Sequence, residues 1–372
     1  MSGRVGDGVG GRRAKRITHF PPHLPAHLGG FVAHSTVRLA LDAMGGDFAP
    51  AIIVDGAVAA ARELGIEVAL VGPEEAVKAE LGRHDTSGLS LPIVHAEEVV
   101  AMDEHAAATV RQKPNSSIAV GINLVKRGDA AGFVSAGNSG AVMAAALFGL
   151  GRIPGVKRPA IGTVYPTVTG RCFIVDIGGN ADCKPEYMLQ FAIMGSAFVE
   201  RILGVQRPRV GLLSNGEEDS KGNALVQATH PLLRASALNF AGNVEGKDIP
   251  RGIDDVVVTD GFSGNIVIKL SEGVGGTILD ILETELTAKL TYKLAAMVLR
   301  PALRRVKKRM DYAEYGGANL LGVNGPVVIA HGRSNALAIK NALRVAKQSV
   351  DQRLVEAIKT GVAGQARAGS PD

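Results

Sequence analysis

The chain has 372 residues, of which 46% are hydrophobic and 21% are charged, and this balance excludes a wholly disordered protein. Its 47 glycines follow no three-residue period, which excludes a collagen-like fibre and indicates many tight turns. The aromatic residues are 10 Phe and 5 Tyr with no Trp, too few for a surface that stacks nucleic-acid bases.

The net charge of +5 comes from one end of the chain. Residues 1–38 carry six basic residues and one acidic residue, so the remaining residues are neutral overall and give little support for nucleic-acid binding. This leader is rich in Gly, His, Pro and Arg and has no apolar segment, so it fits neither a secretory signal nor a transit peptide. We expect residues 1–35 to form a disordered basic extension.

The two cysteines, Cys172 and Cys183, are too few for a disulfide framework and indicate a cytoplasmic protein. The uncharged stretch 130–151 is long enough to cross a bilayer, but the motif SAGNSG at 135–140 interrupts it. Irregular backbone is not tolerated in lipid, so we expect a buried strand, a turn and a buried helix, and no transmembrane segment.

Short β-branched runs alternate with helix-length segments, a pattern typical of α/β proteins with a mainly parallel sheet. The predicted strands are 37–42, 66–71, 91–95, 129–135, 172–177, 209–214, 240–243 and 255–260. The predicted helices are 50–64, 73–81, 115–127, 139–149, 185–203, 221–237, 264–298 and 334–349. Pro50 and Pro185 stand where a first helical residue belongs, whereas Pro301 is expected to break or kink a helix. No Gly/Ser linker divides the chain, so we expect one domain over 36–350 and a helix end with a tail over 351–372.

Six glycine-rich motifs follow predicted strands. They are DAMGGD (42–47), SAGNSG (135–140), DIGGN (176–180), SNGEE (214–218), AGNVEG (241–246) and DGFSGN (260–265). In open α/β sheets the loops at the carboxyl ends of parallel strands converge on a ligand crevice, and glycine lets backbone N–H groups point at an anion. Strand-to-helix turns also use Gly, Asn and Asp for structural reasons alone, so a shared anion site and ordinary turns both stay open.

The segment 176–191, DIGGNADCKPEYMLQF, gives the strongest local signal. A strand ends at Asp176 and a helix begins at Pro185, so its N-terminus suits a phosphate. Lys184 adds a positive charge there, and Asp182 and Glu186 flank it. The alternative is a capped helix beside a solvated charge cluster. Cys183 is expected to be a small buried residue and not a nucleophile.

Residues 286–310 hold eight basic residues and no acid, interleaved with apolar residues at four-residue spacing. We expect a basic amphipathic helical hairpin over 280–312 that meets an anionic membrane or an acidic partner. The alternative is a solvated helix whose apolar ridge packs in a dimer. Val298, Leu299 and Leu303 are expected near the hairpin tip beside Pro301. The expected contact residues are Arg300, Arg304, Arg305, Lys307 and Lys308.

Several familiar site motifs are absent from the sequence after the leader. Residues 36–372 contain no P-loop, no GxGxxG, no GxSxG elbow, no HExxH and no paired-cysteine metal site. We therefore expect neither a cofactor nor a metal.

In eight segments, which include the glycine-rich motifs, the chain resembles the phosphate acyltransferases of bacterial phospholipid synthesis, the PlsX family. The matching segments are LDAMGGD (41–47), LVKRGDAAGFVSAGNSGAVMAA (124–145), DIGGNADCKPEYMLQFA (176–192), RVGLLSNGEED (209–219), KGN (221–223), NFAGNVEG (239–246), DVVVTDGFSGN (255–265) and DYAEYGGANLLGVNGPVVIAHGRS (311–334). The resemblance implies transfer of a fatty acyl group from acyl carrier protein to inorganic phosphate, which gives acyl phosphate for phosphatidic acid synthesis. It also implies a three-layer αβα fold like isocitrate and isopropylmalate dehydrogenases and phosphate acetyltransferase. The resemblance also implies a cytosolic homodimer that makes peripheral contact with an anionic membrane or with a membrane acyltransferase.

This chemistry needs no covalent enzyme intermediate. Phosphate near neutral pH is already a nucleophile, and a thiolate, whose acid has a pKa of about 8.5, is a tolerable leaving group. The site must hold the dianion and stabilise the tetrahedral oxyanion. The expected catalytic residues are Lys184, Asn180, Asn215 and His331. The expected substrate-binding residues are Asp42, Gly45, Gly46, Asn138, Ser139, Asp176, Gly178, Gly179, Asp182, Glu186, Glu217, Asn223, Asp260 and Asn265.

Three alternatives remain open from the sequence. One is a phosphate acetyltransferase-like enzyme that uses acyl-CoA. Another is an NAD-linked decarboxylating dehydrogenase of the same expected fold, which should need a metal-binding carboxylate cluster. The third is a membrane- or nucleic-acid-binding protein without catalysis.

Overall fold

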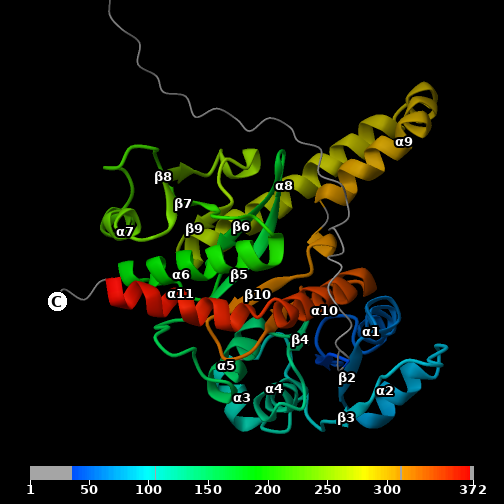
Figure 1. The fold of residues 1–372 in the computed structure, drawn as a ribbon. Coiled ribbons are helices and arrows are strands. Elements are labelled where there is room, and N and C mark those ends of the chain that lie inside the picture. Colours follow the sequence, from blue (N-terminus) through cyan, green and yellow to red (C-terminus); the bar gives the residue numbers. More distant parts are fainter. Residues whose placement is uncertain (1–35, 105, 311, 369–372) are drawn as a thin grey trace, which may run out of the picture.

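The computed structural model describes residues 36–104, 106–310 and 312–368. They form one 11-stranded sheet with helices packed on both faces (Figure 1). The predicted three-layer αβα architecture is therefore confirmed. The extension expected at 1–35 lies outside the described residues.

The first part of the chain alternates strands and helices as the sequence predicts. Its elements are β1 (Arg38–Asp42), α1 (Ala51–Leu64), β2 (Glu67–Gly72), α2 (Glu74–Leu81), β3 (Ile93–His95), α3 (Ala106–Gln112), α4 (Ser117–Arg127), β4 (Phe133–Ser135) and α5 (Ser139–Gly149). Helix α5 begins and ends at the predicted residues, whereas α3 was not predicted.

The rest of the chain adds seven strands and six helices among the described residues. They are β5 (Ala160–Thr167), β6 (Gly170–Val175), α6 (Pro185–Phe198, continued by a π-helical turn Val199–Leu203), β7 (Arg209–Ser214), α7 (Ala224–Arg234), β8 (Asn239–Glu245), β9 (Val256–Val258), α8 (Gly261–Thr287), α9 (Leu290–Met310), β10 (Ala318–Leu321), β11 (Val327–Ile329), α10 (Ala336–Asp351) and α11 (Leu354–Ala368). Strands β5, β10 and β11 were not predicted. Helix α11 packs on α6 through Leu354, Ile358 and Val362, so these residues belong to the same core as the rest of the domain.

Strand direction reverses in the middle of the sheet. The strand order is β3-β2-β1-β4-β11-β10-β5-β6-β9-β7-β8. The pairs β11–β10, β10–β5 and β5–β6 are antiparallel, and all other pairs are parallel. Three reversals are an odd number, so β6, β9, β7 and β8 run opposite to β1, β2, β3, β4 and β11.

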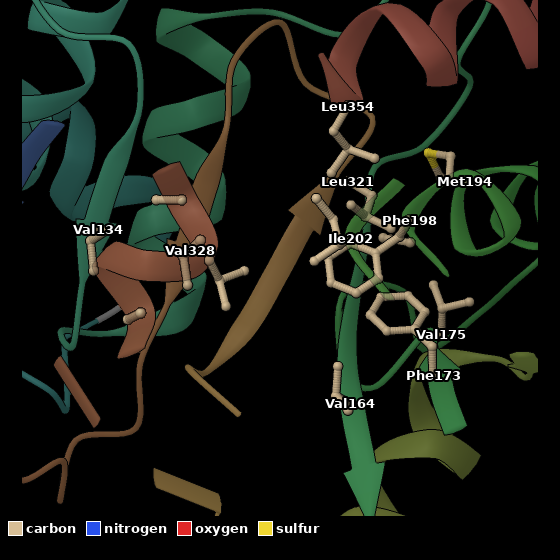
Figure 2. Packing of buried hydrophobic residues seen from close by; sticks show 14 of the residues in the cluster. Val134, Val164, Phe173, Val175, Met194, Phe198, Ile202, Leu321, Val328 and Leu354 are labelled. Atoms are coloured by element: carbon tan, nitrogen blue, oxygen red, sulfur yellow. The ribbon is translucent and has the colours of Figure 1, made fainter. Parts of the chain in front are cut away.

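Helices α1, α6, α7, α10 and α11 cover one face of the sheet, and α3, α4, α5 and α8 cover the other. Phe173 on β6 stacks on Phe198 of α6 with ring centroids 4.2 Å apart (Figure 2). Room for the Phe173 ring comes from Gly162 on the neighbouring strand, because a Cβ at residue 162 would lie 2.3 Å from Cζ of Phe173. This contact closes the core where the two halves of the sheet join.

Helices α8 and α9 form an arm that projects from the body (Figure 1). The expected break at Pro301 is wrong, because Pro301 lies inside α9 and the chain reverses at Ala288 and Lys289. The N–H of Ala288 donates to the carbonyl of Glu285, and the Thr287 hydroxyl donates to the carbonyls of Glu283 and Thr284. These short-range bonds end α8 at this point. The proline removes a single helical hydrogen bond within α9.

The corrected turn moves the apolar residues that were expected at the tip. Val298, Leu299 and Leu303 lie along α9 and not at the turn. Val298 is 80% exposed, so it remains available for a contact outside this chain. The hairpin is also longer than expected and runs from Gly261 to Met310.

Within residues 36–104, 106–310 and 312–368, no helix has both the length and the apolar character needed to span a lipid bilayer.

We expect Gly162→Ala to lower the free energy of unfolding by about 1–3 kcal/mol, because the added methyl group overpacks the Phe173 ring. Urea denaturation measures this change. Phe173→Leu is the partner variant: in its background Gly162→Ala should cost clearly less, since the ring is gone. Equal costs in both backgrounds would contradict this account of the junction.

Candidate active site

The strand reversal divides the six glycine motifs between two opposite sides of the sheet. Each is a side at which one set of strands ends, and we call them edge A and edge B. Edge A is formed by the ends of β1, β4 and β11 and carries 42–47, 135–140 and 331–334. Edge B is formed by the ends of β6, β9, β7 and β8 and carries 176–184, 259–265, 214–223 and 245–248. Of the two interpretations that the sequence left open, a single crevice shared by all six motifs does not form within one chain. The sequence did not reveal the three antiparallel pairings. Because of them, the carboxyl ends of β6, β7, β8 and β9 lie at edge B and not at edge A.

At edge A the loops are held by the buried carboxylate of Asp42. It accepts hydrogen bonds from the Ser135 hydroxyl at 2.7 Å and from the Met44 N–H at 3.0 Å. The Ser135 oxygen in turn accepts from the Gly137 N–H at 3.0 Å. Burial raises the pKa of Asp42, and bonds from Ser117, Ser135 and the backbone oppose the rise. Asp42 thus joins the loops after β1 and β4.

The remaining residues expected at edge A surround this network. Gly45 packs so closely that a Cβ there would lie 2.5 Å from the Asp42 carboxylate, and Gly46 adopts a φ of +104°. Asn138 caps α5 and donates to the carbonyls of Met102 and Glu104, and Ser139 next to it is exposed. His331 is exposed and its Nδ1 accepts from the N–H of Arg333, which places the ring proton of the neutral form on Nε2.

At edge B the buried carboxylate of Asp176 has the same organising part. It accepts from the N–H groups of Gly178, Gly179 and Asn180 at 3.3, 2.9 and 2.7 Å, and from the Asn180 side-chain amide at 2.9 Å. It also accepts from the N–H of Ile161 at 3.0 Å. Burial raises the pKa of Asp176, and these bonds oppose the rise. The N–H groups of 178–180 are therefore engaged by the protein's own carboxylate and not by a ligand.

The first turn of α8 presses on this loop. The Gly261 N–H donates to the carbonyl of Asn180 at 2.7 Å. A Cβ at Gly264 would lie 1.9 Å from the carbonyl oxygen of Asp176, so only glycine fits there. Asp260 caps α8 by accepting from the N–H of Ser263, and Asn265 on the same turn is half-buried. The motifs 176–180 and 260–265 are thus one packed unit.

Lys184 stands at the start of α6, beside this unit. It occupies the N-cap position, makes no capping side-chain bond, and is followed by Pro185 as the first helical residue, as predicted. Lys184 is exposed and forms no ion pair with any residue that the structure describes, and Asp182 is exposed as well. Glu186 instead faces Lys157, at 3.8 Å. A cation and an uncapped helix N-terminus therefore face solvent together, which suits an anion.

Cys183 lies between these groups but is not activated. Burial raises the pKa of its thiol to about 11, and the charge of Asp176 adds to the rise. A nucleophilic cysteine needs a lowered pKa, and this one is raised. Cys183 packs against the core but is half-buried and not buried as expected.

The side chains of two other expected residues at edge B accept hydrogen bonds from nearby backbone N–H groups. The Asn215 side-chain oxygen accepts from the Gly222 N–H and closes the loop after β7. Asn223 caps α7 by accepting from the Val226 N–H. Glu217 is exposed and lies with Glu245 and Asp248, whose ligand oxygens are all within 4.8 Å of one another. Ser117, Ser135, Glu245 and Asp248 were not among the expected residues, although Ser135 and Glu245 stand inside glycine motifs.

A family model described as "Fatty acid synthesis protein" matches residues 37–357. A "Phosphate acyltransferase" of Geobacter sulfurreducens is 51% identical over 328 residues, which cover 87% of this chain and 95% of the relative. One of Desulfitobacterium hafniense is 52% identical over 324 residues, which cover 87% and 97%.

Solved structures with the same fold are more distant in sequence. The EutD phosphotransacetylase of Staphylococcus aureus has a TM-score of 0.57 at 18% identity and covers 85% of this chain and 94% of its own. A 4-hydroxythreonine-4-phosphate dehydrogenase of Klebsiella pneumoniae has a TM-score of 0.51 at 13% identity and covers 86% and 99%. These two support the fold, whereas the family match and the relatives establish the class: the chain belongs to the fatty acid synthesis protein family of phosphate acyltransferases and is an acyltransferase.

Proposed function

We propose that this enzyme moves a fatty acyl group from acyl carrier protein to inorganic phosphate and forms acyl phosphate for phospholipid synthesis. The observation that carries this proposal is the exposed Lys184 at the uncapped start of α6, in a chain of this family. A dianion is stabilised both by the ammonium group and by the positive end of the helix dipole.

The reaction balances without an enzyme nucleophile. A phosphate oxygen attacks the thioester carbonyl, the tetrahedral intermediate collapses, and the C–S bond breaks to release the carrier's thiolate. Lys184 holds the phosphate, and the unit 176–180 with 260–265 fixes the position of α6 beside it. Asp176 is in this scheme a positioning residue, because its carboxylate shapes the turn through backbone N–H groups. His331 stands at the other edge of the sheet, so the proposed site does not include it as the proton donor.

The arm provides the surfaces for the proposed partners. Helix α8 exposes Phe262, Ile266, Leu270, Val274 and Ile278 at four-residue spacing, which suits packing against a second copy of the chain. Helix α9 exposes Arg300, Arg304 and Arg305, and Lys308 pairs with Glu314 at 3.5 Å. A basic face of this kind attracts an anionic membrane surface or the acidic carrier protein. We therefore propose a cytoplasmic homodimer with peripheral membrane contact.

The substrate is tested by incubating the protein with phosphate and either acyl carrier protein thioester or acyl-CoA, and trapping acyl phosphate with hydroxylamine. The proposal expects product from the carrier protein thioester. Product from acyl-CoA alone would favour the phosphate acetyltransferase-like alternative, and no product from either would contradict the function.

Lys184→Ala should leave the fold intact and lower acyl-phosphate formation at subsaturating phosphate by at least about tenfold, because a charge-assisted contact is worth roughly 1.5–3 kcal/mol. Lys157→Ala is the matched control, since Lys157 pairs with Glu186 of the first helical turn and does not occupy the N-cap position. Near-normal turnover of Lys184→Ala would exclude its role in binding phosphate.

The double variant Cys172→Ala, Cys183→Ala should keep most of the activity, because phosphate attacks the thioester directly and the Cys183 pKa of about 11 leaves little thiolate at neutral pH. Turnover and circular dichroism are measured together. An acyl-cysteine trapped by mass spectrometry, or loss of activity in a folded protein, would require a covalent mechanism instead.

Replacing Arg304, Arg305, Lys307 and Lys308 by Gln should abolish binding to anionic vesicles at low salt, because each basic side chain near such a surface contributes only about 1 kcal/mol and several must act together. Vesicle co-sedimentation and the Michaelis constant for acyl carrier protein are compared. Intact vesicle binding with a raised Michaelis constant would assign this face to the carrier protein. No change in either would show that α9 is simply solvated.

A further inference from the structure

The loops after β7 and β8 bring three carboxylates together at edge B. One ligand oxygen each from Glu217, Glu245 and Asp248 lies within 4.8 Å of the other two. Two of the three, Glu217 and Glu245, also line an open depression, together with Asn215, Gly216, Glu218 and Lys221. Three like charges at this separation repel one another unless a cation lies among them.

The basic side chains nearby compensate this charge only in part. Lys247 contacts Glu245, and Arg251 donates to Asp248 at 2.9 Å. The side chains of Lys247 and Arg251 are 59% and 66% exposed, and such surface pairs contribute little. Glu217 forms no ion pair with a residue in the described part of the chain. With Lys221 and Glu218 of the depression included, four carboxylates face three basic side chains, so one negative charge remains in excess.

Buried oxygens without partners give a second, independent observation. Asp248 is only 4% exposed, and its Oδ2 accepts no hydrogen bond. Asn243 is fully buried, its Nδ2 donates to the carbonyl of Glu218, and its Oδ1 has no partner. Ser214 Oγ is also buried and unpaired. Buried oxygens without a partner are costly, and a cation bound here would supply one.

The two strands place these groups on one face. Asn243 and Glu245 are two residues apart on β8, so their side chains point to the same side of the sheet. Ser214 on β7 is the register partner of Glu245. The donor set consists of carboxylate, amide and hydroxyl oxygens, without His or Cys, and such a set suits a hard divalent cation. Oxygens bound to one cation of this kind lie about 3 Å apart when adjacent and about 4–5 Å apart when opposite, so separations of at most 4.8 Å allow all three carboxylates to bind one ion.

We propose that Glu217, Glu245 and Asp248 form a binding site for a divalent cation such as Mg²⁺, Mn²⁺ or Ca²⁺, in which the ion displaces the ammonium group of Lys247. The pKa of Lys247 is raised by its hydrogen bond to Glu245, and the charges of Asp248 and Glu217 add to the rise, so the location already favours a cation. The depression otherwise repels phosphate, since Glu217, Glu218 and Glu245 line it.

Binding of Mn²⁺ to the full chain, followed by electron paramagnetic resonance and isothermal titration, tests this proposal without an activity assay. The wild-type protein should bind Mn²⁺ saturably, with Mg²⁺ and Ca²⁺ as competitors. Glu217→Gln should weaken Mn²⁺ binding by at least about tenfold. Its matched control is Glu218→Gln, which removes a neighbouring carboxylate of the same depression outside the cluster and should change binding by less than about threefold.

Lys247→Met removes the competing ammonium group and should tighten Mn²⁺ binding. Absence of saturable binding at millimolar Mn²⁺, or an equal loss in Glu217→Gln and Glu218→Gln, would overturn the site. Unchanged affinity in Lys247→Met would equally show that the ion does not occupy the position of the ammonium group.

Discussion

Three antiparallel pairings in the middle of the sheet, β11–β10, β10–β5 and β5–β6, decide where each loop of this protein can act. Because their number is odd, the strands on either side run in opposite directions, and the loops that follow them emerge at opposite edges. A mainly parallel sheet of this kind has two sets of carboxyl ends instead of one. The packing of Gly162 against Phe173 stabilises the junction, so a contact in the core supports the division of the loops on the surface.

Each edge is organised by one buried aspartate at the end of a strand. Asp42 gathers hydroxyl and backbone donors from the loops after β1 and β4, and Asp176 gathers backbone donors from the turn after β6. Buried carboxylates are costly without such donors, which explains why both carry so many. The glycines beside them give the backbone the freedom to bend toward the carboxylate. Their abundance therefore serves the protein's own acids before it serves any ligand.

Short apolar runs predicted the parallel strands well, since β1, β2, β6 and β7 are largely apolar and are followed by turn residues. They missed β5, which contains Gly162 and Pro166, and β10 and β11, which have only four and three residues. The pairs β5–β6 and β10–β11 are hairpins joined by residues 168–169 and 322–326, whereas the pairing of β10 with β5 joins segments that lie far apart in the chain, which no local pattern shows. For the same reason Lys184 and His331 were expected in one site, whereas the strand reversal places them at opposite edges of the sheet. Asn138, Asn223 and Asp260 were expected to bind substrate, and their side chains cap helices, a use of the same residue types that spacing cannot distinguish.

Helix α8 starts against Asn180 and Asp176 and continues for 27 residues, so it is about 40 Å long. Gly264 packs so closely on the turn that the base of the helix has little room to shift. A sideways movement of about 1 Å at the far end then corresponds to a tilt of only about 1.4° at the base of the helix. A contact that fixes the far end of the arm to within about 1 Å therefore also fixes, to within about 1.4°, the angle between α8 and the turn beside Lys184.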